Sequence, residues 1–222
     1  MESIPSFETL DKRLGYFFRR GSNLLVLGPP MSGKKFFSKT FAYRGLLDGE
    51  ACIFTCTNDT AENESKQFNE FGYDVKQFEA EGSLVYVDFY SKTIGLKCEE
   101  KKHVKYVSSM MDLTGYNVAV RDLTVEFWRK RKPIRLVFDS VTALLLYNEI
   151  RTVIRFLHIL FGRLKNLKAI SLFLVEEGMH SHEVIVTLTS MVDGVIETKN
   201  KNEKHYVKVK SETLSLEWIP LT

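Results

Sequence analysis

The sequence predicts an α/β fold with a mostly parallel central sheet, flanking helices, and antiparallel strands at the C-terminal edge. Apolar runs rich in β-forming residues alternate with amphipathic segments through most of the chain. A glycine-rich turn joins the first apolar run to the first helical segment. This alternation of strands and helices is typical of a doubly wound sheet, and continuous apolar runs indicate strands that are buried on both faces.

The expected elements follow from these patterns. Strands are predicted at 24–27, 51–57, 83–88, 134–140 and 171–175, and the alternating runs 206–210 and 214–219 predict antiparallel edge strands. Helices are predicted at about 35–47, 61–72, 117–131 and 149–168, while 184–188 fits either a strand or the start of a helix. On the first helix, Lys35, Lys39 and Arg44 are expected to face solvent.

Composition indicates an ordinary globular chain. It has 222 residues, of which 44% are hydrophobic and 27% charged, so we expect one core and a single domain over residues 1–222. The net charge of +3 permits contact with nucleic acid without arguing strongly for it. The three cysteines show no metal-ligand spacing, and no apolar stretch approaches a membrane span, so we expect a cytoplasmic protein without membrane contact.

The most informative stretch is the turn at residues 28–34, which reads GPPMSGK. Its glycines and terminal lysine, placed between a strand and a helix, are typical of a phosphate-binding loop, in which backbone N–H groups and the helix N-terminus surround an anion. The simpler alternative is a Gly/Pro turn before a basic surface helix. The residues expected to bind nucleotide are Gly28, Pro29, Pro30, Met31, Ser32, Gly33, Lys34, Lys35 and Phe36.

The loop departs from the usual pattern at Lys35, where the motif requires Ser or Thr to hold Mg²⁺. Two interpretations remain open from sequence. The Lys35 side chain points to solvent and leaves a metal-poor site, or its ammonium group replaces part of the charge of the metal and permits binding without Mg²⁺.

A second motif lies at residues 134–140, where a hydrophobic strand delivers Asp139 at its carboxyl end. In open α/β sheets ligands bind at this edge, and a carboxylate there can hold Mg²⁺. Asp139 is therefore the expected metal ligand if Mg²⁺ binds at all, and a helix cap is its simpler alternative role.

Together these motifs resemble the RecA-superfamily ATPases, closest to the KaiC-like group known mainly from archaea and cyanobacteria. The resemblance covers nearly the whole chain. The matching segments are 10–15, 20–22, the phosphate-binding loop, 45–50, 71–74, 81–84, 138–140 and 193–196. The resemblance implies a RecA-like core, ATP or ADP as ligand, and ring or filament assembly with nucleotide between subunits.

Several family positions are altered. The resemblance places Thr57 and Asn58 where family members carry two glutamates, one of which activates water, and neither residue can act as a general base near neutral pH. Asp59 is adjacent, but a helix-capping role is simpler for it. The family's late Lys-Met-Arg-Gly motif corresponds to residues 208–211, which lack the arginine.

We therefore expect a nucleotide-binding pseudoenzyme with weak or absent hydrolysis and a regulatory or assembly role. One alternative is an active ATPase that uses Glu176 or Glu177. Another is a recombination-associated module that binds single-stranded nucleic acid through the basic cluster 129–132, whose simpler role is to end a helix. A second copy of the chain or a related RecA-like protein is the expected partner.

Residues 91–116 give the weakest prediction. They are rich in charge and are expected to form a variable insertion, either a solvated excursion or a loop over the nucleotide or a partner site.

Overall fold

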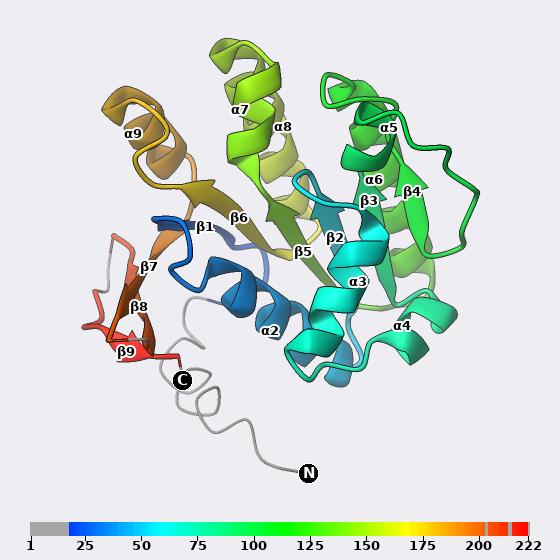
Figure 1. Ribbon diagram of the computed structural model, residues 1–222, viewed down its shortest axis with the longest axis horizontal. Helices are drawn as coiled ribbons and strands as arrows, with labels where there is room; N and C mark the ends of the chain where they lie inside the picture. The colour runs from blue at the N-terminus through cyan, green and yellow to red at the C-terminus, as the bar shows by residue number, and fades with distance from the viewer. Residues whose placement is uncertain (1–17, 203, 213–214, 222) are drawn as a thin grey trace.

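A nine-stranded sheet forms the centre of the computed structural model, which describes residues 18–202, 204–212 and 215–221 (Figure 1). The strand order is β4-β3-β2-β5-β6-β1-β7-β8-β9. The first seven strands in this order run parallel, whereas β8 and β9 pair antiparallel at one edge. The predicted fold class is confirmed. The proposed motif at 10–15 lies outside the described residues.

The strands have these bounds: β1 Asn23–Gly28, β2 Ala51–Cys56, β3 Leu84–Asp88, β4 Val104–Tyr106, β5 Ile134–Asp139, β6 Ile170–Glu176, β7 Gly194–Lys201, β8 Lys204–Lys210 and β9 Ile219–Pro220. The helices are α2 Lys34–Leu47, α3 Ala61–Glu70, α4 Lys76–Glu81, α5 Tyr90–Thr93, α6 Leu113–Arg129, α7 Val141–Tyr147, α8 Ile150–Asn166 and α9 His182–Ser190.

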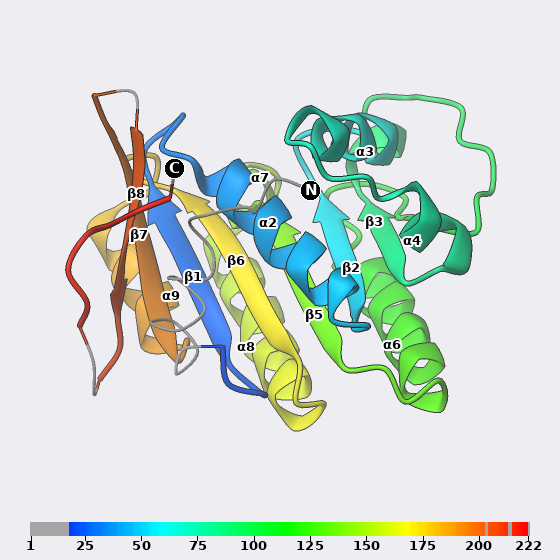
Figure 2. The same ribbon diagram turned by 90° about the horizontal axis from the view of Figure 1, so that it is seen from below.

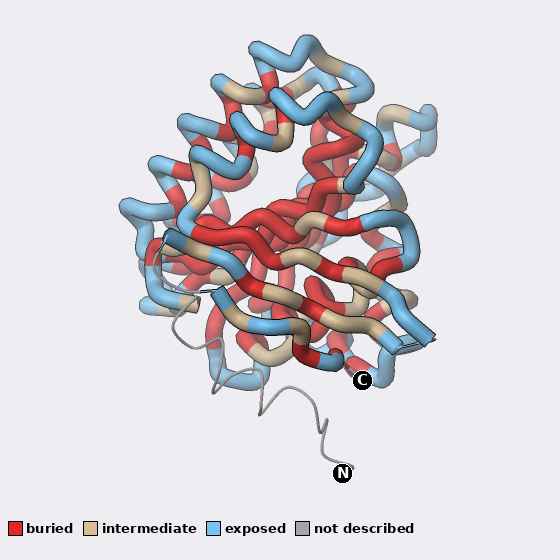
Figure 3. Tube along the Cα trace, turned by 90° about the vertical axis from the view of Figure 1, so that its left-hand side faces the viewer, coloured by how far each residue is buried: buried red, intermediate tan, exposed pale blue. Residues whose placement is uncertain are grey.

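Helices cover both faces of the sheet. Figure 2 shows α2, α3 and α4 on one face, with α6, α8 and α9 on the other. Each face has its own apolar layer, because the strand side chains alternate between the two sides. The central strands are buried along their length, and the outer turns of the helices are exposed (Figure 3). This arrangement brings the carboxyl ends of β1, β2, β5 and β6 to one edge.

Two details differ from the sequence prediction, and the choice between strand and helix left open at 184–188 is resolved. Lys39 does not face solvent: its side chain is fully buried because it finds a carboxylate partner under α2. The segment 184–188 lies inside helix α9. Helix α6 begins four residues earlier than expected, because the Asp112 side chain caps it by accepting a hydrogen bond from Gly115 N at 2.7 Å.

The segment 91–116 contains more structure than an excursion. It includes the end of α5, the edge strand β4, and the start of α6. Strand β4 pairs with β3, so this segment extends the sheet on the side away from β7. In the run 214–219, the described residues form strand only at Ile219, the first residue of β9.

Aromatic stacking in the layer under α6 and α8 gives a stability prediction. Phe173 is fully buried, stacks on Phe138 with ring centroids 5.9 Å apart, and meets the Phe161 ring edge-on at 4.6 Å. Phe173→Ala should lower the free energy of unfolding by about 3–5 kcal/mol, because it removes these contacts and leaves a cavity. Urea denaturation measures this. Trp128→Ala, at an aromatic residue that is 74% exposed, is the control and should change stability by less than about 0.5 kcal/mol. Equal losses in the two variants would contradict the assignment of the core.

Candidate nucleotide-binding site

The turn at residues 28–34, which we call the phosphate-binding loop after its predicted role, connects the carboxyl end of β1 to the first turn of α2. Gly33 precedes the helix with φ 94°, a conformation that favours glycine. Gly28 is required for space, since a Cβ there would lie 2.1 Å from Thr198 Oγ1 on β7. Ser32 and Thr198 hydrogen-bond through their hydroxyl groups at 2.6 Å. The loop is therefore held closely against strand β7.

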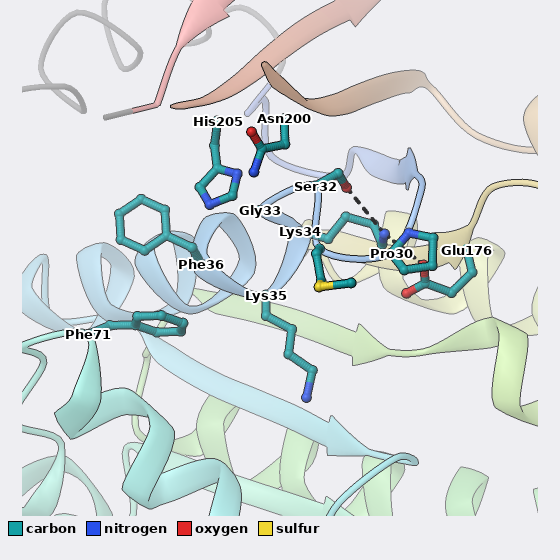
Figure 4. Close-up of a pocket in the computed structure, with 11 residues that line it drawn as sticks. Pro30, Ser32, Gly33, Lys34, Lys35, Phe36, Phe71, Glu176, Asn200 and His205 are labelled. Atoms are coloured by element: carbon teal, nitrogen blue, oxygen red, sulfur yellow. Dashed lines mark hydrogen bonds and ion pairs between the residues drawn. The ribbon is translucent and has the colours of Figure 1, made fainter. Parts of the chain in front are cut away.

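Lys34 lies within this loop, and its side chain is only 5% exposed. Its ammonium group donates hydrogen bonds to the carbonyl oxygens of Gly28 and Pro29, both at 2.7 Å. It also donates to Ser32 Oγ at 3.3 Å (Figure 4). A fourth residue, Glu176 at the end of β6, accepts a charged hydrogen bond from Lys34 at 2.9 Å. Glu176 thus neutralises the charge that would otherwise meet a phosphate group.

Glu176 is held in place by its backbone. Its N–H donates to Thr142 Oγ1 at 2.9 Å, and the same hydroxyl lies 3.1 Å from His180 Nε2. Partial burial lowers the pKa of His180. Glu177, the other glutamate considered from sequence, is exposed, and its N–H donates to the Gly28 carbonyl at 2.9 Å. Glu176, not Glu177, contacts the lysine of the loop.

Asp139 lies at the carboxyl end of β5, as predicted, and its side chain is buried. Asn58 Nδ2 approaches Asp139 Oδ1 at 3.4 Å, while Asp139 Oδ2 has no hydrogen-bond partner within the protein. Burial, together with the nearby charge of Glu64, raises the pKa of Asp139 to about 6. Asp139 is therefore the buried carboxylate of the site whose second oxygen is unpaired.

A buried carboxylate from α3 completes the charged centre. Glu64 is 1% exposed and forms a short ion pair with the fully buried Lys39 of α2. The Lys39 ammonium group also lies 4.7 Å from the Phe54 ring centroid and 4.5 Å from that of Phe68. These rings help to replace the hydration that Lys39 loses on burial.

Lys35 lies on the same side of α2, one turn before Lys39. Its ammonium group is 3.7 Å from Glu64 Oε1, and its side chain is 44% exposed. Burial would lower the pKa of Lys35, but the carboxylates of Glu64, Asp139 and Asp59 outweigh it and raise the pKa. The side chain is thus half-exposed and faces carboxylates, and its positive charge is favoured.

Sequence reasoning missed Glu64. It lies in the strongly polar stretch 61–67, where nothing in its spacing marks a functional residue. The helical spacing offered one signal. Ala61, Glu64 and Phe68 share one face of α3, and all three are buried. A charged residue on an apolar face implies a buried partner, which here is Lys39.

The end of β2 supplies no carboxylate to the site. Thr57 Oγ1 donates to the carbonyl oxygen of Asp139 at 2.7 Å and accepts from Ser140 N at 2.5 Å. Asn58 Nδ2 donates to Ser140 Oγ at 3.1 Å. The capping role expected of Asp59 belongs to Thr60, whose Oγ1 accepts from Asn63 N at 3.1 Å, while Asp59 accepts from Thr60 N and from the Asn63 side-chain amide. The Thr57 and Asn58 side chains therefore link the end of β2 to the end of β5.

The donor set does not fit a Mg²⁺ ion held by the protein. The hydroxyl that would bind the metal is replaced by the Lys35 ammonium group, and Glu64 is already paired with Lys39. Asp139 alone retains a buried, unpaired carboxylate oxygen. Within the described ranges, no group of three or more His, Cys, Asp and Glu side chains could hold a metal ion. Mg²⁺ takes most of its ligands from water and phosphate oxygens and needs only one or two carboxylates, but the charge of the Lys35 ammonium group near Asp139 disfavours a second cation at this position.

A cavity of about 500 Å³ opens beside the loop (Figure 4). Its lining contains the predicted residues from Pro30 to Phe36 together with Glu176. Sequence reasoning did not identify three further lining residues, Phe71, Asn200 and His205. Asn200 and His205 are brought there by the pairing of β7 with β8, which no local pattern indicates.

The two other basic segments lie apart from this cavity. Residues 129–132 connect the end of α6 to the start of β5, at the edge of the sheet opposite the loop. There Lys130 pairs with Glu126, and Lys132 donates to Ser83 Oγ at 2.7 Å. Residues 208–211 end strand β8, where Lys210 pairs with Glu197 of β7. Nucleic-acid binding by 129–132 stays a prediction.

A parallel sheet with a phosphate-binding loop after β1 and an aspartate after β5 defines a P-loop protein of the RecA type. The KaiC family model, which describes ATPases, matches residues 5–215. The chain therefore belongs to the KaiC family of ATPases, and the resemblance inferred from the motifs is confirmed.

Known relatives agree with this assignment. A UPF0273 protein from Pyrobaculum aerophilum is 31% identical over 127 residues, which are 56% of this chain and 42% of that protein. One from Pyrococcus furiosus is 30% identical over 125 residues, 54% of this chain and 47% of the relative. The chain spans about half the length of the curated relatives it matches.

Solved structures share the fold. A KaiC-like protein from Pyrococcus horikoshii superposes with a TM-score of 0.68 at 19% identity, covering 91% of this chain and 86% of that one. The flagellar accessory protein FlaH from Methanocaldococcus jannaschii superposes with a TM-score of 0.66 at 19% identity, covering 92% of this chain and 83% of that one.

Among the described residues, no helix is long and apolar enough to cross a bilayer.

The buried ion pair gives a second stability prediction. Glu64→Gln should lower the free energy of unfolding by about 3–5 kcal/mol, because it leaves the Lys39 charge buried without a counter-charge. Glu62→Gln is the matched control on the same helix. Glu62 and Lys66 form an ion pair in which both side chains are 63% exposed to solvent, so this change should have little effect on stability. Chemical denaturation of both variants measures the difference, and equal effects would contradict a buried pair.

Asp139 gives a pH prediction. Its pKa is raised from 3.8 to about 6, so the folded protein keeps a proton that the unfolded chain has lost between these pH values. The stability that this proton contributes is present below about pH 4 and is lost as the pH rises to 6, a change of about 3 kcal/mol. Relative to Asp139→Asn, the wild type should therefore lose stability over this interval, as measured by urea denaturation at each pH. A relative gain would contradict the raised pKa.

Proposed function

We propose that this chain binds ATP or ADP at the phosphate-binding loop and hydrolyses ATP weakly or not at all. The observation that carries the proposal is the pairing of an intact loop lysine, Lys34, with a β2 terminus where Thr57 hydrogen-bonds to backbone groups. The first supports phosphate binding. The second supports the loss of hydrolysis, because phosphoryl transfer to water needs a positioned nucleophile.

Binding requires that a phosphate group compete with Glu176 for Lys34. The ion pair between Lys34 and Glu176, 2.9 Å long, is only partly shielded from solvent, since the Glu176 side chain is 28% exposed. A polyphosphate carries more charge than one carboxylate and also accepts bonds from the loop N–H groups. Phosphate binding would therefore release the Glu176 carboxylate toward solvent.

Lys35 supports binding without a metal ion. Its ammonium group lies 3.7 Å from Glu64 Oε1, and the carboxylates of Glu64 and Asp139 outweigh the effect of burial and raise its pKa, which keeps it charged. A positive charge at this position would stabilise the terminal phosphates and repel Mg²⁺. Of the two interpretations open from sequence, this geometry favours replacement of the metal charge by Lys35.

An active ATPase that uses Glu176 as base is the second candidate. Its support is the position of this carboxylate beside Lys34 at the end of β6. The ion pair counts against it in the free protein, because the Glu176 carboxylate must leave Lys34 before it can orient water. A regulatory role, a cytoplasmic location, and assembly with a second copy or a related RecA-like chain belong to the first proposal.

The role of Lys34 is tested by calorimetric titration of ATP and ADP. Lys34→Ala should abolish measurable binding, because it removes the central phosphate contact, and the wild type should show no turnover above background in a phosphate-release assay. Lys66→Ala, at an exposed lysine of α3, is the control and should bind as the wild type does. Robust turnover that Lys34→Ala abolishes would refute the proposal in favour of the active ATPase. In that case Glu176→Gln would identify the base.

The role of Lys35 is tested by restoring the hydroxyl. Lys35→Thr should make ATP binding dependent on Mg²⁺, because it supplies a metal ligand next to Asp139 and removes the competing charge. Lys35→Ala removes the charge without supplying the ligand, so it should weaken ATP binding at every Mg²⁺ concentration. Calorimetric titration of ATP with and without Mg²⁺ distinguishes the Lys35→Thr variant from the Lys35→Ala variant. Wild-type affinity in Lys35→Ala would show that this side chain contributes nothing to binding.

A further inference from the structure

Helices α6 and α8 leave a groove between them on the face of the sheet opposite α2 (Figure 2). Both helices run in the same direction, because each leads into one of two neighbouring parallel strands, β5 and β6. They lie side by side, since the Tyr116 ring of α6 meets the Phe156 ring of α8 edge-on at 5.7 Å. The groove has a volume of about 360 Å³ and shares no lining residue with the cavity beside the phosphate-binding loop.

The groove has an apolar floor and a partly apolar rim. Val120, Leu160 and Leu164 are buried and form the floor. Val125 of α6 and Leu167, just after α8, also line the groove and are 42% and 40% exposed. Covering exposed aliphatic side chains is favourable in water, so the groove is suited to an apolar side chain from a partner.

The exposed side of α6 extends this apolar surface. Val118, Val125 and Trp128 lie at positions i, i+7 and i+10, so they share one side of the helix. All three are exposed, and Trp128 is the most exposed of them. Several exposed apolar side chains in one row mark an interaction surface, and tryptophan is among the residues that contribute most to binding at protein interfaces.

Positive charge flanks the groove on both sides. Arg121 of α6 and Arg163 of α8 line it. Helix α8 contains no acidic residue and four basic ones, Arg151, Arg155, Arg163 and Lys165. Of these four, Lys165 alone pairs with a carboxylate in the part of the chain that the structure describes, that of Asp193. Arg121 pairs with the adjacent Asp122 at the surface, where such a pair is weak. The groove therefore offers unneutralised positive charge beside an apolar floor.

We propose that the α6–α8 groove binds an acidic amphipathic helix of a partner protein. The apolar side of that helix fills the groove, and its carboxylates pair with Arg121 and Arg163. Each flanking helix has 17 residues and is about 25 Å long, so a partner helix of about four or five turns matches the groove in length. The proposal goes beyond nucleotide binding and does not depend on it.

Two other occupants fit the groove less well. A second copy of the chain that docked through the same face would bring the same basic helix, and like charges would repel. Nucleic acid supplies negative charge but has no aliphatic side chains to cover Val125 and Leu167. An acidic amphipathic helix supplies both the charge and the apolar side chains.

The probe is a fluorescein-labelled synthetic helix of about 18 residues, with leucines along one side and glutamates beside them. Its binding is measured by fluorescence anisotropy without nucleotide. Wild-type protein should bind it at least about tenfold more tightly than a scrambled peptide of the same composition, because only the ordered peptide presents an apolar side. Arg163→Glu should weaken binding by about tenfold or more, because it replaces attraction by repulsion. Trp128→Ala should weaken it by a similar factor.

Lys76→Glu is the matched control. It makes the same change of charge at an exposed lysine of α4, on the opposite face of the sheet, and should leave peptide binding unchanged. Thermal melting verifies that each variant folds. Wild-type protein that binds neither peptide, or binds both equally, would overturn the proposal. Equal weakening by Arg163→Glu and Lys76→Glu would also overturn it, since binding would then follow overall charge.

An oligothymidylate of about 20 nucleotides tests the alternative of nucleic acid under the same conditions. Wild-type protein should bind it more weakly than the ordered acidic peptide. Tighter binding of the oligonucleotide, lost in Arg163→Glu, would overturn the proposal and assign this basic face to nucleic acid.

Discussion

Lys35 and Lys39 lie one turn apart on α2 and approach the same buried carboxylate, that of Glu64. The rest of the site depends on this arrangement of charge. Lys39 is fully buried and fixes Glu64 against the sheet, while the half-exposed Lys35 follows Lys34 in the first turn of α2 and approaches Glu64 at 3.7 Å. The positive charges of Lys35 and Lys39 balance the negative charges of the Glu64 and Asp139 carboxylates when all four groups are ionised. A divalent cation added to this cluster would upset that balance, because among the described residues of the cluster only Asp139 has an unpaired buried carboxylate oxygen.

The second constraint is the closeness of the β7–β8 hairpin to the loop. Gly28 has no room for a side chain because of Thr198, and Gly33 has none because of His205. The hairpin therefore shapes both the loop and the cavity beside it. The residues predicted to contact phosphate come from the loop after β1, the start of α2 and the end of β6, whereas Asn200 and His205 of the same cavity come from the hairpin. The cavity therefore brings together parts of the chain that lie far apart in sequence.

The sequence allowed the sheet, the loop and Asp139 to be predicted, because apolar runs and glycine spacing are local signals. Only the family resemblance indicates that Thr57 and Asn58 stand where family members carry two glutamates. Glu64, Asn200 and His205 could not be identified, since each depends on packing between distant elements. Lys39 was assigned to solvent because a lysine on a basic helix usually faces water, and only the partner under the helix explains its burial. Glu176 was considered as a base, whereas its ion pair with Lys34 became visible only in three dimensions.

The central claim is that Lys35 has taken the place of the metal ion, and the most direct measurement is the affinity of wild-type protein for ATP as free Mg²⁺ is raised. The account predicts an affinity that stays constant or falls, because Mg²⁺ bound to the phosphates competes with the Lys35 ammonium group. An affinity that rises with Mg²⁺ would show that the metal contributes to binding. That result would contradict the account, and would mean that Lys35 moves aside to let Asp139 serve as a metal ligand.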